Sequence, residues 1–232
     1  MHTILLLHGA LGTKRQLAFL ADGLDHTRCL SPTFSGHGQG EVPPEGLSFD
    51  LFLADIDAAL EKESGPVHLF GYSMGGYAAL LWAARHPGRV ASVATLGTKL
   101  LWTEDGLRKE LARLDPATME EKVPEFAMGL AAAHGPARWK DLVAHTAALI
   151  ERTAAQPPLT DAVLAAIECP VLLCVGDRDS TAVPGDTLRV AGQLKDAGVL
   201  VLPRTRHPFE DADLDLLITQ LSRFWEGVAP EE

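Results

Sequence analysis

Residues 71–76 read GYSMGG, which places Ser73 between glycines directly after the apolar run 67–70. A serine on a tight strand-to-helix turn exposes its hydroxyl, but the strained backbone requires neighbours without side chains two positions away. The backbone N–H of Met74 would then lie at a helix N-terminus, where it can meet a developing negative charge. An ordinary glycine-rich turn without a catalytic role also fits this pattern. The motif alone therefore does not distinguish a nucleophilic serine from a structural one, and other parts of the chain must be considered.

A serine hydroxyl is a poor nucleophile at neutral pH, so it needs a base, and the base needs an acid that fixes its tautomer. In an open parallel sheet the reactive crevice lies outside the carboxyl ends of the strands, so both partners should follow strands. Asp177, Asp179 and His207 meet this condition. Asp177 and Asp179 lie two residues apart in the same turn. An acid at the earlier position, here Asp177, more often orders the loop, so we prefer Asp179 as the acid that fixes the base. Ser73, Asp179 and His207 then follow the chain order that accompanies such a serine turn.

The elements that must position these residues alternate between strand and helix. Short apolar runs without polar alternation indicate strands that are buried on both faces of a parallel sheet. Helical spacing between the runs predicts crossover helices, with Thr13 and Ser48 as N-caps. The α/β order indicates a doubly wound, mostly parallel sheet. Strands are expected at 3–7, 27–31, 67–70, 90–96, 170–175 and 199–202, and helices after 13, at 48–60, 78–85, 186–197 and 211–226.

The alternation stops between Gly97 and Glu168, where helical patterns at 104–114, 118–133, 137–154 and 160–167 occur without a convincing strand. We interpret 98–168 as a helical insertion over one edge of the sheet, and 1–97 with 169–232 as the core. Large side chains in the insertion either pack it together or line a substrate pocket, and both interpretations stay open. The candidate pocket residues are Leu11, Trp102, Phe126, Met128 and Trp139.

Composition narrows the function classes. With 232 residues, 47% hydrophobic and 22% charged, the chain is typical of a globular protein, and a net charge of −11 argues against a nucleic-acid partner. No apolar stretch is long enough to span a membrane and no signal peptide is recognisable, so we expect a cytoplasmic protein that acts on a small molecule. Cys29, Cys169 and Cys174 are expected to be buried free thiols. No H-x-x-x-H or C-x-x-C spacing occurs, so we predict no metal and no cofactor.

Four motifs in order resemble the α/β-hydrolase superfamily over nearly the whole chain. They are LLHGALG at 6–12, GHG at 36–38, GYSMGG at 71–76, and PVLL at 170–173 before GDRD at 176–179. The resemblance implies a helical cap after the sixth strand of the family pattern, which matches the insertion.

The same resemblance implies roles for individual residues. Ser73 would be the nucleophile, Asp179 in the G-x-x-D turn the acid, and His207 the base. The oxyanion hole would use the backbone N–H groups of Ala10 and Met74, in preference to that of Leu11. The remaining histidines are interpreted as structural, surface or core residues: His2, His8, His26, His37, His68, His86, His134 and His145.

The chain departs from the family pattern at its start, because only two residues precede the strand that leads into His8-Gly9. Family members usually carry two antiparallel strands there. We therefore expect an α/β-hydrolase fold whose first two strands are missing, with about six strands in the sheet.

The leading functional hypothesis is a serine hydrolase that cleaves an ester or similar small acyl substrate. Relatives of this fold also cleave carbon–carbon bonds or act as lyases, including a lyase of menaquinone synthesis, and others bind a ligand without turnover. A lyase acting on an anionic metabolite would need cationic groups in the cap that face the substrate. The alternative interpretation is that these cationic side chains belong to solvent-exposed helix faces. The candidates are Lys99, Arg108, Lys109, Arg113, Arg138 and Lys140.

Overall fold

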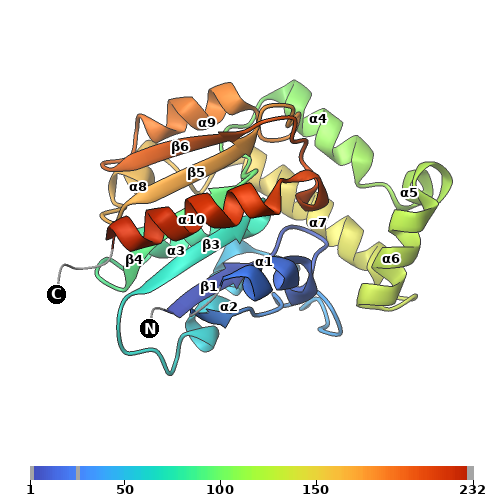
Figure 1. Cartoon of the computed structure of the whole chain (residues 1–232). Helices are drawn as coiled ribbons and strands as arrows, with labels where there is room; N and C mark the ends of the chain where they lie inside the picture. The colour runs from blue at the N-terminus through green and yellow to red at the C-terminus, as the bar shows by residue number, and fades with distance from the viewer. Residues whose placement is uncertain (1–2, 25–26, 229–232) are drawn as a thin grey trace.

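A computed structural model describes residues 3–24 and 27–228 and contains one parallel sheet (Figure 1). The strands lie in the order β2-β1-β3-β4-β5-β6, and every neighbouring pair is parallel. The predicted six-stranded, doubly wound α/β fold is confirmed. The strands are β1 (Thr3–Leu7), β2 (Arg28–Leu30), β3 (Val67–Tyr72), β4 (Val90–Leu96), β5 (Val171–Gly176) and β6 (Ala197–Leu202).

Helices cover both faces of the sheet, and each face has its own apolar core. On one face, α1 (Ala18–Gly23) and α10 (Leu214–Val228) pack over a cluster that includes Leu20, Leu217 and Leu221. On the other face lie α2 (Phe49–Ala59), α3 (Met74–Arg85), α8 (Asp161–Ala165) and α9 (Pro184–Ala191), whose buried side chains form a larger cluster. The short helices η1 (Lys14–Leu17) and η2 (Phe209–Asp211) lie in connections.

The strand order reverses between β1 and β3. The chain passes from β1 outward to β2 and then returns to place β3 on the other side of β1, with Leu7 opposite Gly71. Crossovers that leave in opposite directions open a crevice at the carboxyl ends of these two strands. The turns after β1 and β3, which carry His8-Gly9 and Ser73, therefore meet at this crevice.

The segment between β4 and β5 is helical throughout, and Figure 1 shows α4, α5 and α6 beyond one end of the sheet. We call α4–α7 the cap helices. Their bounds are α4 (Glu104–Arg113), α5 (Pro116–Lys122), α6 (Pro124–His134) and α7 (Trp139–Ala155).

The single helix predicted at 118–133 was wrong, because the structure has two helices there. Pro124 starts α6, and the preceding Val123 leaves helical geometry with φ −138° and ψ 59°. A proline cannot donate a backbone hydrogen bond and disfavours helical backbone at the residue before it. The bend changes which side chains of this segment can reach the site.

Other expected boundaries shifted by a few residues. The helix predicted at 186–197 ends at Ala191, and the following turn leads into β6 at Ala197. The last helix begins at Leu214 rather than 211, after the short helix η2. His2 and His26 lie outside the described residues. Within 3–24 and 27–228, no helix has the length and apolar character that crossing a bilayer requires.

Candidate active site

Ser73 lies on a sharp turn between β3 and α3. Its backbone has φ 50° and ψ −114°, in the left-handed half of conformational space, which is strained for a residue with a side chain. The turn is held by the Ser73 N–H, which donates to the Leu96 carbonyl at 2.8 Å, and by Thr98 Oγ1, which donates to the Ser73 carbonyl at 3.1 Å. These bonds keep the serine side chain projecting from the turn.

Two glycines make this turn possible because the chain approaches itself closely there. A Cβ on Gly71 would lie 2.3 Å from the Gly76 nitrogen, and a Cβ on Gly75 would lie 2.2 Å from the Leu7 carbonyl oxygen. Both distances are far below contact distance, and the obstacles are backbone atoms. The GYSMGG sequence is therefore a steric requirement of the turn.

Ser73, His207 and Asp179 form a continuous hydrogen-bonded chain. Ser73 Oγ lies 3.2 Å from His207 Nε2, and His207 Nδ1 lies 2.8 Å from Asp179 Oδ2. Because a carboxylate can only accept, Nδ1 carries the imidazole proton and Nε2 is left as the acceptor for the serine hydroxyl. The structure thus brings together the three residues that the sequence selected.

Asp179 is itself fixed by its own loop. Its side chain is buried, and Oδ1 accepts hydrogen bonds from the Thr181 and Ala182 backbone N–H groups, both at 2.8 Å. Both carboxylate oxygens are therefore satisfied, which allows a charged group to remain buried. The orientation of Oδ2 toward His207 follows from this arrangement.

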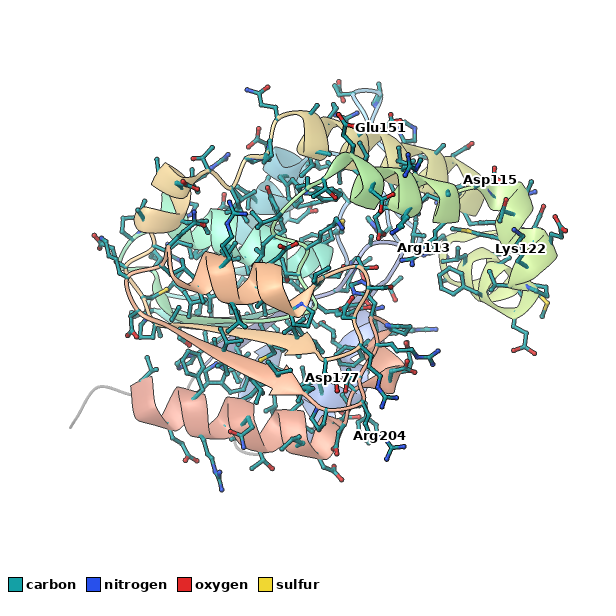
Figure 2. All side chains as sticks on the ribbon, turned by 90° about the horizontal axis from the view of Figure 1, so that it is seen from above. Arg113, Asp115, Lys122, Glu151, Asp177 and Arg204 are labelled. Atoms are coloured by element: carbon teal, nitrogen blue, oxygen red, sulfur yellow. The ribbon has the colours of Figure 1, made fainter. Side chains whose placement is uncertain are left out.

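Asp177, the acid not selected, orders the loop that carries His207. Its Oδ1 accepts the Thr205 N–H at 3.1 Å, and the Arg178 N–H donates to the Thr205 carbonyl at 3.0 Å. These bonds join the loops after β5 and β6, and Figure 2 shows Asp177 and Arg204 in this region. From β3, the Tyr72 hydroxyl donates to the His207 carbonyl at 2.9 Å. Burial raises the pKa of Tyr72, so it remains a donor.

The turn after β1 carries Ala10 and lies against the serine turn. Leu11 has φ 59°, an uncommon value for a leucine, and the Gly9 N–H donates to Gln16 Oε1 at 2.9 Å. Within the described part of the chain, neither the Ala10 N–H nor the Met74 N–H has a hydrogen-bond acceptor. Both residues line the same pocket as Ser73. Two unused backbone donors therefore border this pocket.

Three buried, neutral histidines lie next to the turn that carries Ala10. His8 Nε2 accepts the Phe34 N–H at 3.0 Å, and the His8 and His37 rings meet edge to face at 5.0 Å. Burial lowers the pKa of His8 to about 3 and that of His37 to about 4. The third is His134, at the end of α6, where Nδ1 accepts the Gly38 N–H at 2.8 Å.

Comparison with known proteins agrees with this arrangement. A family model described as "Alpha/beta hydrolase family" matches residues 4–218. The chain belongs to this family. Among curated relatives, the chain is 26% identical over 204 residues to the thermostable monoacylglycerol lipase of Bacillus sp. (strain H-257), covering 79% of this chain and 72% of the lipase.

A second relative is named for different chemistry. A Bacillus subtilis (strain 168) protein, provisionally named 2-succinyl-6-hydroxy-2,4-cyclohexadiene-1-carboxylate synthase, is 29% identical over 130 residues, or 54% of this chain and 45% of that protein. The match thus spans less than half of the relative's length. Among solved structures, NosK from Streptomyces actuosus superposes with a TM-score of 0.81 at 24% identity, covering 98% of both chains. That likeness shows the shared fold.

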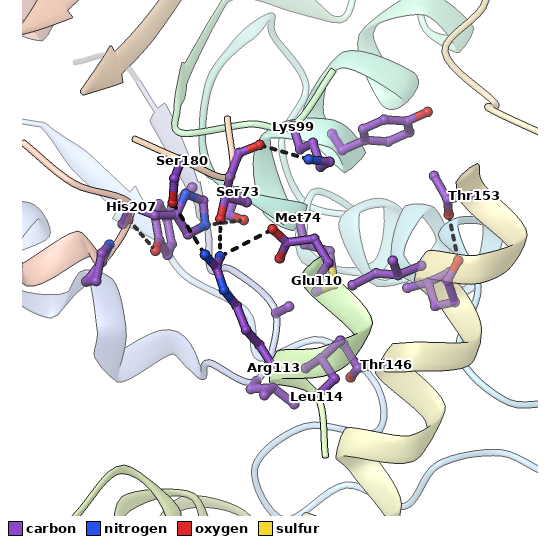
Figure 3. A pocket seen from close by; sticks show the side chains of 18 of the residues that line it. Ser73, Met74, Lys99, Glu110, Arg113, Leu114, Thr146, Thr153, Ser180 and His207 are labelled. Atoms are coloured by element: carbon purple, nitrogen blue, oxygen red, sulfur yellow. Dashed lines mark hydrogen bonds and ion pairs between the residues drawn. The ribbon is translucent and has the colours of Figure 1, made fainter. Parts of the chain in front are cut away.

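A pocket of about 520 Å³ lies at Ser73, between the cap helices and the carboxyl ends of the strands (Figure 3). Ser73, His207, Ala10 and Met74 all line it. Of the candidate pocket residues, Leu11, Trp102 and Phe126 also line it.

Two candidate pocket residues lie outside this lining. Met128 is 69% exposed on α6, whereas Trp139 is buried inside the cap in a cluster with Met119 and Val143. Their assignment to the pocket is corrected accordingly.

Two of the six cationic candidates, Lys99 and Arg113, line the pocket at Ser73. The other four lie away from it and have partners elsewhere. Arg108 and Lys109 pair with Asp105, Lys140 pairs with Glu120, and Arg138 donates to Gln39.

Cysteines and metal ligands play no visible part in this site. Cys174 is buried, and burial raises the pKa of its thiol to about 12, while Cys29 and Cys169 are partly buried and free. Over residues 3–24 and 27–228, no group of three or more His, Cys, Asp or Glu side chains is arranged to hold a metal ion.

The residues that sequence analysis missed are those that position others. His134 appeared only among the structural or surface histidines, yet its Nε2–H donates to the Leu11 carbonyl at 2.9 Å. Arg178, which lines the pocket at Ser73, was not singled out although it precedes Asp179 directly. Its place beside the G-x-x-D acid was the only available signal.

Proposed function

We propose that this α/β-hydrolase cleaves an ester or similar small acyl substrate through an acyl-enzyme on Ser73. The observation that carries the proposal is the chain from Ser73 Oγ to His207 Nε2 at 3.2 Å and from His207 Nδ1 to Asp179 Oδ2 at 2.8 Å. This is the arrangement that activates a serine hydroxyl: the imidazole accepts its proton, and the carboxylate holds the tautomer and stabilises the imidazolium.

In the proposed reaction, Ser73 Oγ attacks the substrate carbonyl while its proton passes to His207 Nε2. The tetrahedral intermediate then collapses, the bond to the leaving alcohol breaks, and the alcohol takes the proton from His207. A water molecule, deprotonated by the same imidazole, attacks the acyl-enzyme, releasing the carboxylic acid and restoring the Ser73 hydroxyl.

The N–H groups of Ala10 and Met74 would stabilise the oxyanion that forms in both steps. Support comes from their place in the pocket lining and from the lack of an acceptor for either N–H among the described residues. Met74 is also the first residue of α3, so the helix dipole adds to the positive potential at its N–H. One such donor contributes about 3 kcal/mol to transition-state stabilisation in related chemistry.

Replacement of the nucleophile tests the proposal. Ser73→Ala should abolish multiple turnover of p-nitrophenyl butanoate and covalent labelling by a fluorophosphonate probe, while the exposed Ser64→Ala serves as the matched control. Acid quench during turnover, followed by peptide mass spectrometry, should find the butanoyl group on Ser73. Labelling or turnover that survives in Ser73→Ala would refute the assignment.

A second candidate keeps the same three residues but uses them for carbon–carbon cleavage or elimination on a small anionic metabolite. Two observations favour considering it: Lys99 and Arg113 line the pocket, and one relative bears the synthase name given above. The two reactions differ in their intermediate. Elimination would leave no acyl group on Ser73, so acid quench during turnover of a candidate anionic metabolite, in place of the ester, would separate them.

A further inference from the structure

The pocket has an apolar end and a cationic end, and this division points to a substrate class. Resting on the proposed function, we propose that the preferred substrates are esters with an apolar acyl chain and an anionic leaving group. The acyl chain would lie against α7, and the anion would bind Arg113 and Arg178.

The apolar end is built from α2, α3 and α7. Phe49, Tyr77 and Leu149 line it and are buried. Thr146 and Thr153 also belong to the lining, but their hydroxyls donate at 2.8 Å to the carbonyls of the residues four positions earlier in α7. With those hydroxyls used inside the helix, the threonines offer mainly their methyl groups to a ligand.

Tyr77 brings one hydroxyl to this end, and its acceptor side is used within the protein while its O–H stays a neutral donor. Its oxygen accepts the Leu159 N–H at 3.1 Å, and burial raises the pKa of Tyr77 to about 12. An alkyl or similar apolar chain therefore fits this end, whereas a carboxylate would lose its hydration there and gain only the neutral Tyr77 O–H as a partner.

The other end of the lining is cationic although the whole chain carries a charge of −11. Its four cationic side chains outnumber the two carboxylates, Glu110 and Glu210. The cationic residues are Lys99, Arg113, Arg178 and Arg206.

Three of these four cations, Arg206, Lys99 and Arg113, already have partners within the protein. Arg206 pairs with Asp211 at 2.6 Å, and Lys99 Nζ donates to the Thr181 carbonyl at 3.0 Å. Arg178 is exposed and, within residues 3–24 and 27–228, has no side-chain hydrogen bond or ion pair. It is therefore available to a ligand.

Arg113 reaches the same end from the cap. Figure 3 shows its side chain extending from α4 toward the loop that holds Ser180. It donates to Thr181 Oγ1 at 2.9 Å and to Ser180 Oγ at 3.4 Å, with Glu110 at 3.4 Å. A guanidinium has five N–H donors, so it retains donors for an anion. Arg178 in the core loop and Arg113 in the cap thus both offer N–H donors to an anion in this pocket.

The order of the reaction assigns the anion to the leaving group. After the first step the acyl group remains bonded to Ser73, while the alcohol must depart before water attacks. The buried apolar end suits the part that stays, and the exposed arginines suit the part that leaves. An anion on the acyl chain would instead be forced into the apolar end, where the donor on offer is the neutral Tyr77 O–H and not a cationic side chain.

Two isosteric esters test this inference: 4-carboxyphenyl butanoate and its neutral analogue 4-carbamoylphenyl butanoate. The measured quantity is the ratio of their kcat/KM values, because the variant-to-wild-type change in that ratio cancels intrinsic reactivity. Arg113→Gln and Arg178→Gln should each lower the ratio about three- to fivefold, as expected for partly exposed charge pairs, and the double variant roughly tenfold. Arg108→Gln, on the same helix but paired with Asp105 away from the pocket, should leave it unchanged.

A ratio that stays constant in both single variants and in the double variant would overturn the inference. So would a wild-type preference for p-nitrophenyl hydrogen glutarate over p-nitrophenyl butanoate, since that places the anion on the acyl chain. Neither result touches the proposed function, which depends on Ser73-dependent hydrolysis of the neutral esters and on fluorophosphonate labelling.

Discussion

His134 Nε2–H donates to the Leu11 carbonyl at 2.9 Å, while Nδ1 of the same ring accepts the Gly38 N–H at 2.8 Å. One buried imidazole at the end of α6 thus joins the cap to the turn that carries Ala10. Because both ring nitrogens are used, the ring is fixed as the neutral Nε2–H tautomer. Cap position and the position of the Ala10 N–H are coupled through this side chain.

Two substitutions separate the bonds of His134. Glutamine can place a donor near the position of Nε2, whereas asparagine can place an acceptor near that of Nδ1. We expect His134→Gln to retain most of kcat and His134→Asn to lower kcat about tenfold with a smaller change in KM, because only the former holds the Leu11 carbonyl. Steady-state kinetics on p-nitrophenyl butanoate provide the measurement. Equal losses of kcat in both variants, or losses explained by a lower Tm, would show that the ring is merely structural.

The two neighbouring acids should differ sharply in their effect on catalysis. Asp179→Asn would hold the imidazole in the wrong tautomer, and a loss of kcat of about 10³- to 10⁴-fold is expected from related enzymes. Asp177→Asn weakens only the bond to the Thr205 N–H, so kcat should fall about tenfold or less. Comparable losses in kcat for the two variants would contradict the roles given to these acids.

The sequence predicted the sheet and the Ser73, Asp179 and His207 set because their signals are local. A strand buried on both faces is a short apolar run, and the serine turn needs its glycines within a few residues. His134 gave no such signal, because its partners Leu11 and Gly38 lie 123 and 96 residues away in the chain. A contact over that distance depends on how the cap docks.

The orientation of the cap helices also depends on contacts between distant parts of the chain, and it was not predictable from the sequence. Amphipathic spacing predicted these helices, but it did not determine which helix face meets the pocket. Trp139 therefore belongs to the cap core, Met128 faces outward, and Arg113 reaches the site. Only the break at Pro124 was readable in advance, since proline disfavours a continuous helix.

Two glycine substitutions should move stability in opposite directions. In Gly75→Ala the new methyl group would lie 2.2 Å from the Leu7 carbonyl oxygen, so we expect a loss of about 3 kcal/mol or more in the free energy of unfolding. In Gly129→Ala, inside α6, the methyl group meets nothing within 4 Å, so helix propensity should stabilise the protein by up to about 1 kcal/mol. Urea unfolding of both variants would measure this, and a Gly75→Ala protein as stable as wild type would contradict the steric account of the turn.

The buried histidines should make the protein labile to acid. The pKa of His8 is lowered by burial to about 3 and that of His37 to about 4, whereas both have a pKa near 6.5 when unfolded. Between these values the unfolded state binds more protons, so their contribution to stability is fully present above pH 6.5, falls progressively below it, and is completely lost below about 4 for His37 and about 3 for His8. Each histidine should lower the free energy of unfolding by about 1.4 kcal/mol per pH unit between pH 6 and 5.

Urea unfolding at pH 7, 6 and 5 measures this slope, and His37→Asn isolates one proton. The asparagine amide can still donate to the Ser35 carbonyl, which the His37 Nδ1–H contacts at 3.2 Å, but it does not titrate. The slope between pH 6 and 5 should therefore be shallower in the variant by about 1.4 kcal/mol per pH unit. Identical slopes in the two proteins would mean that His37 is not held neutral in the folded state, and that the buried histidine cluster of His8, His37 and His134 tolerates a positive charge.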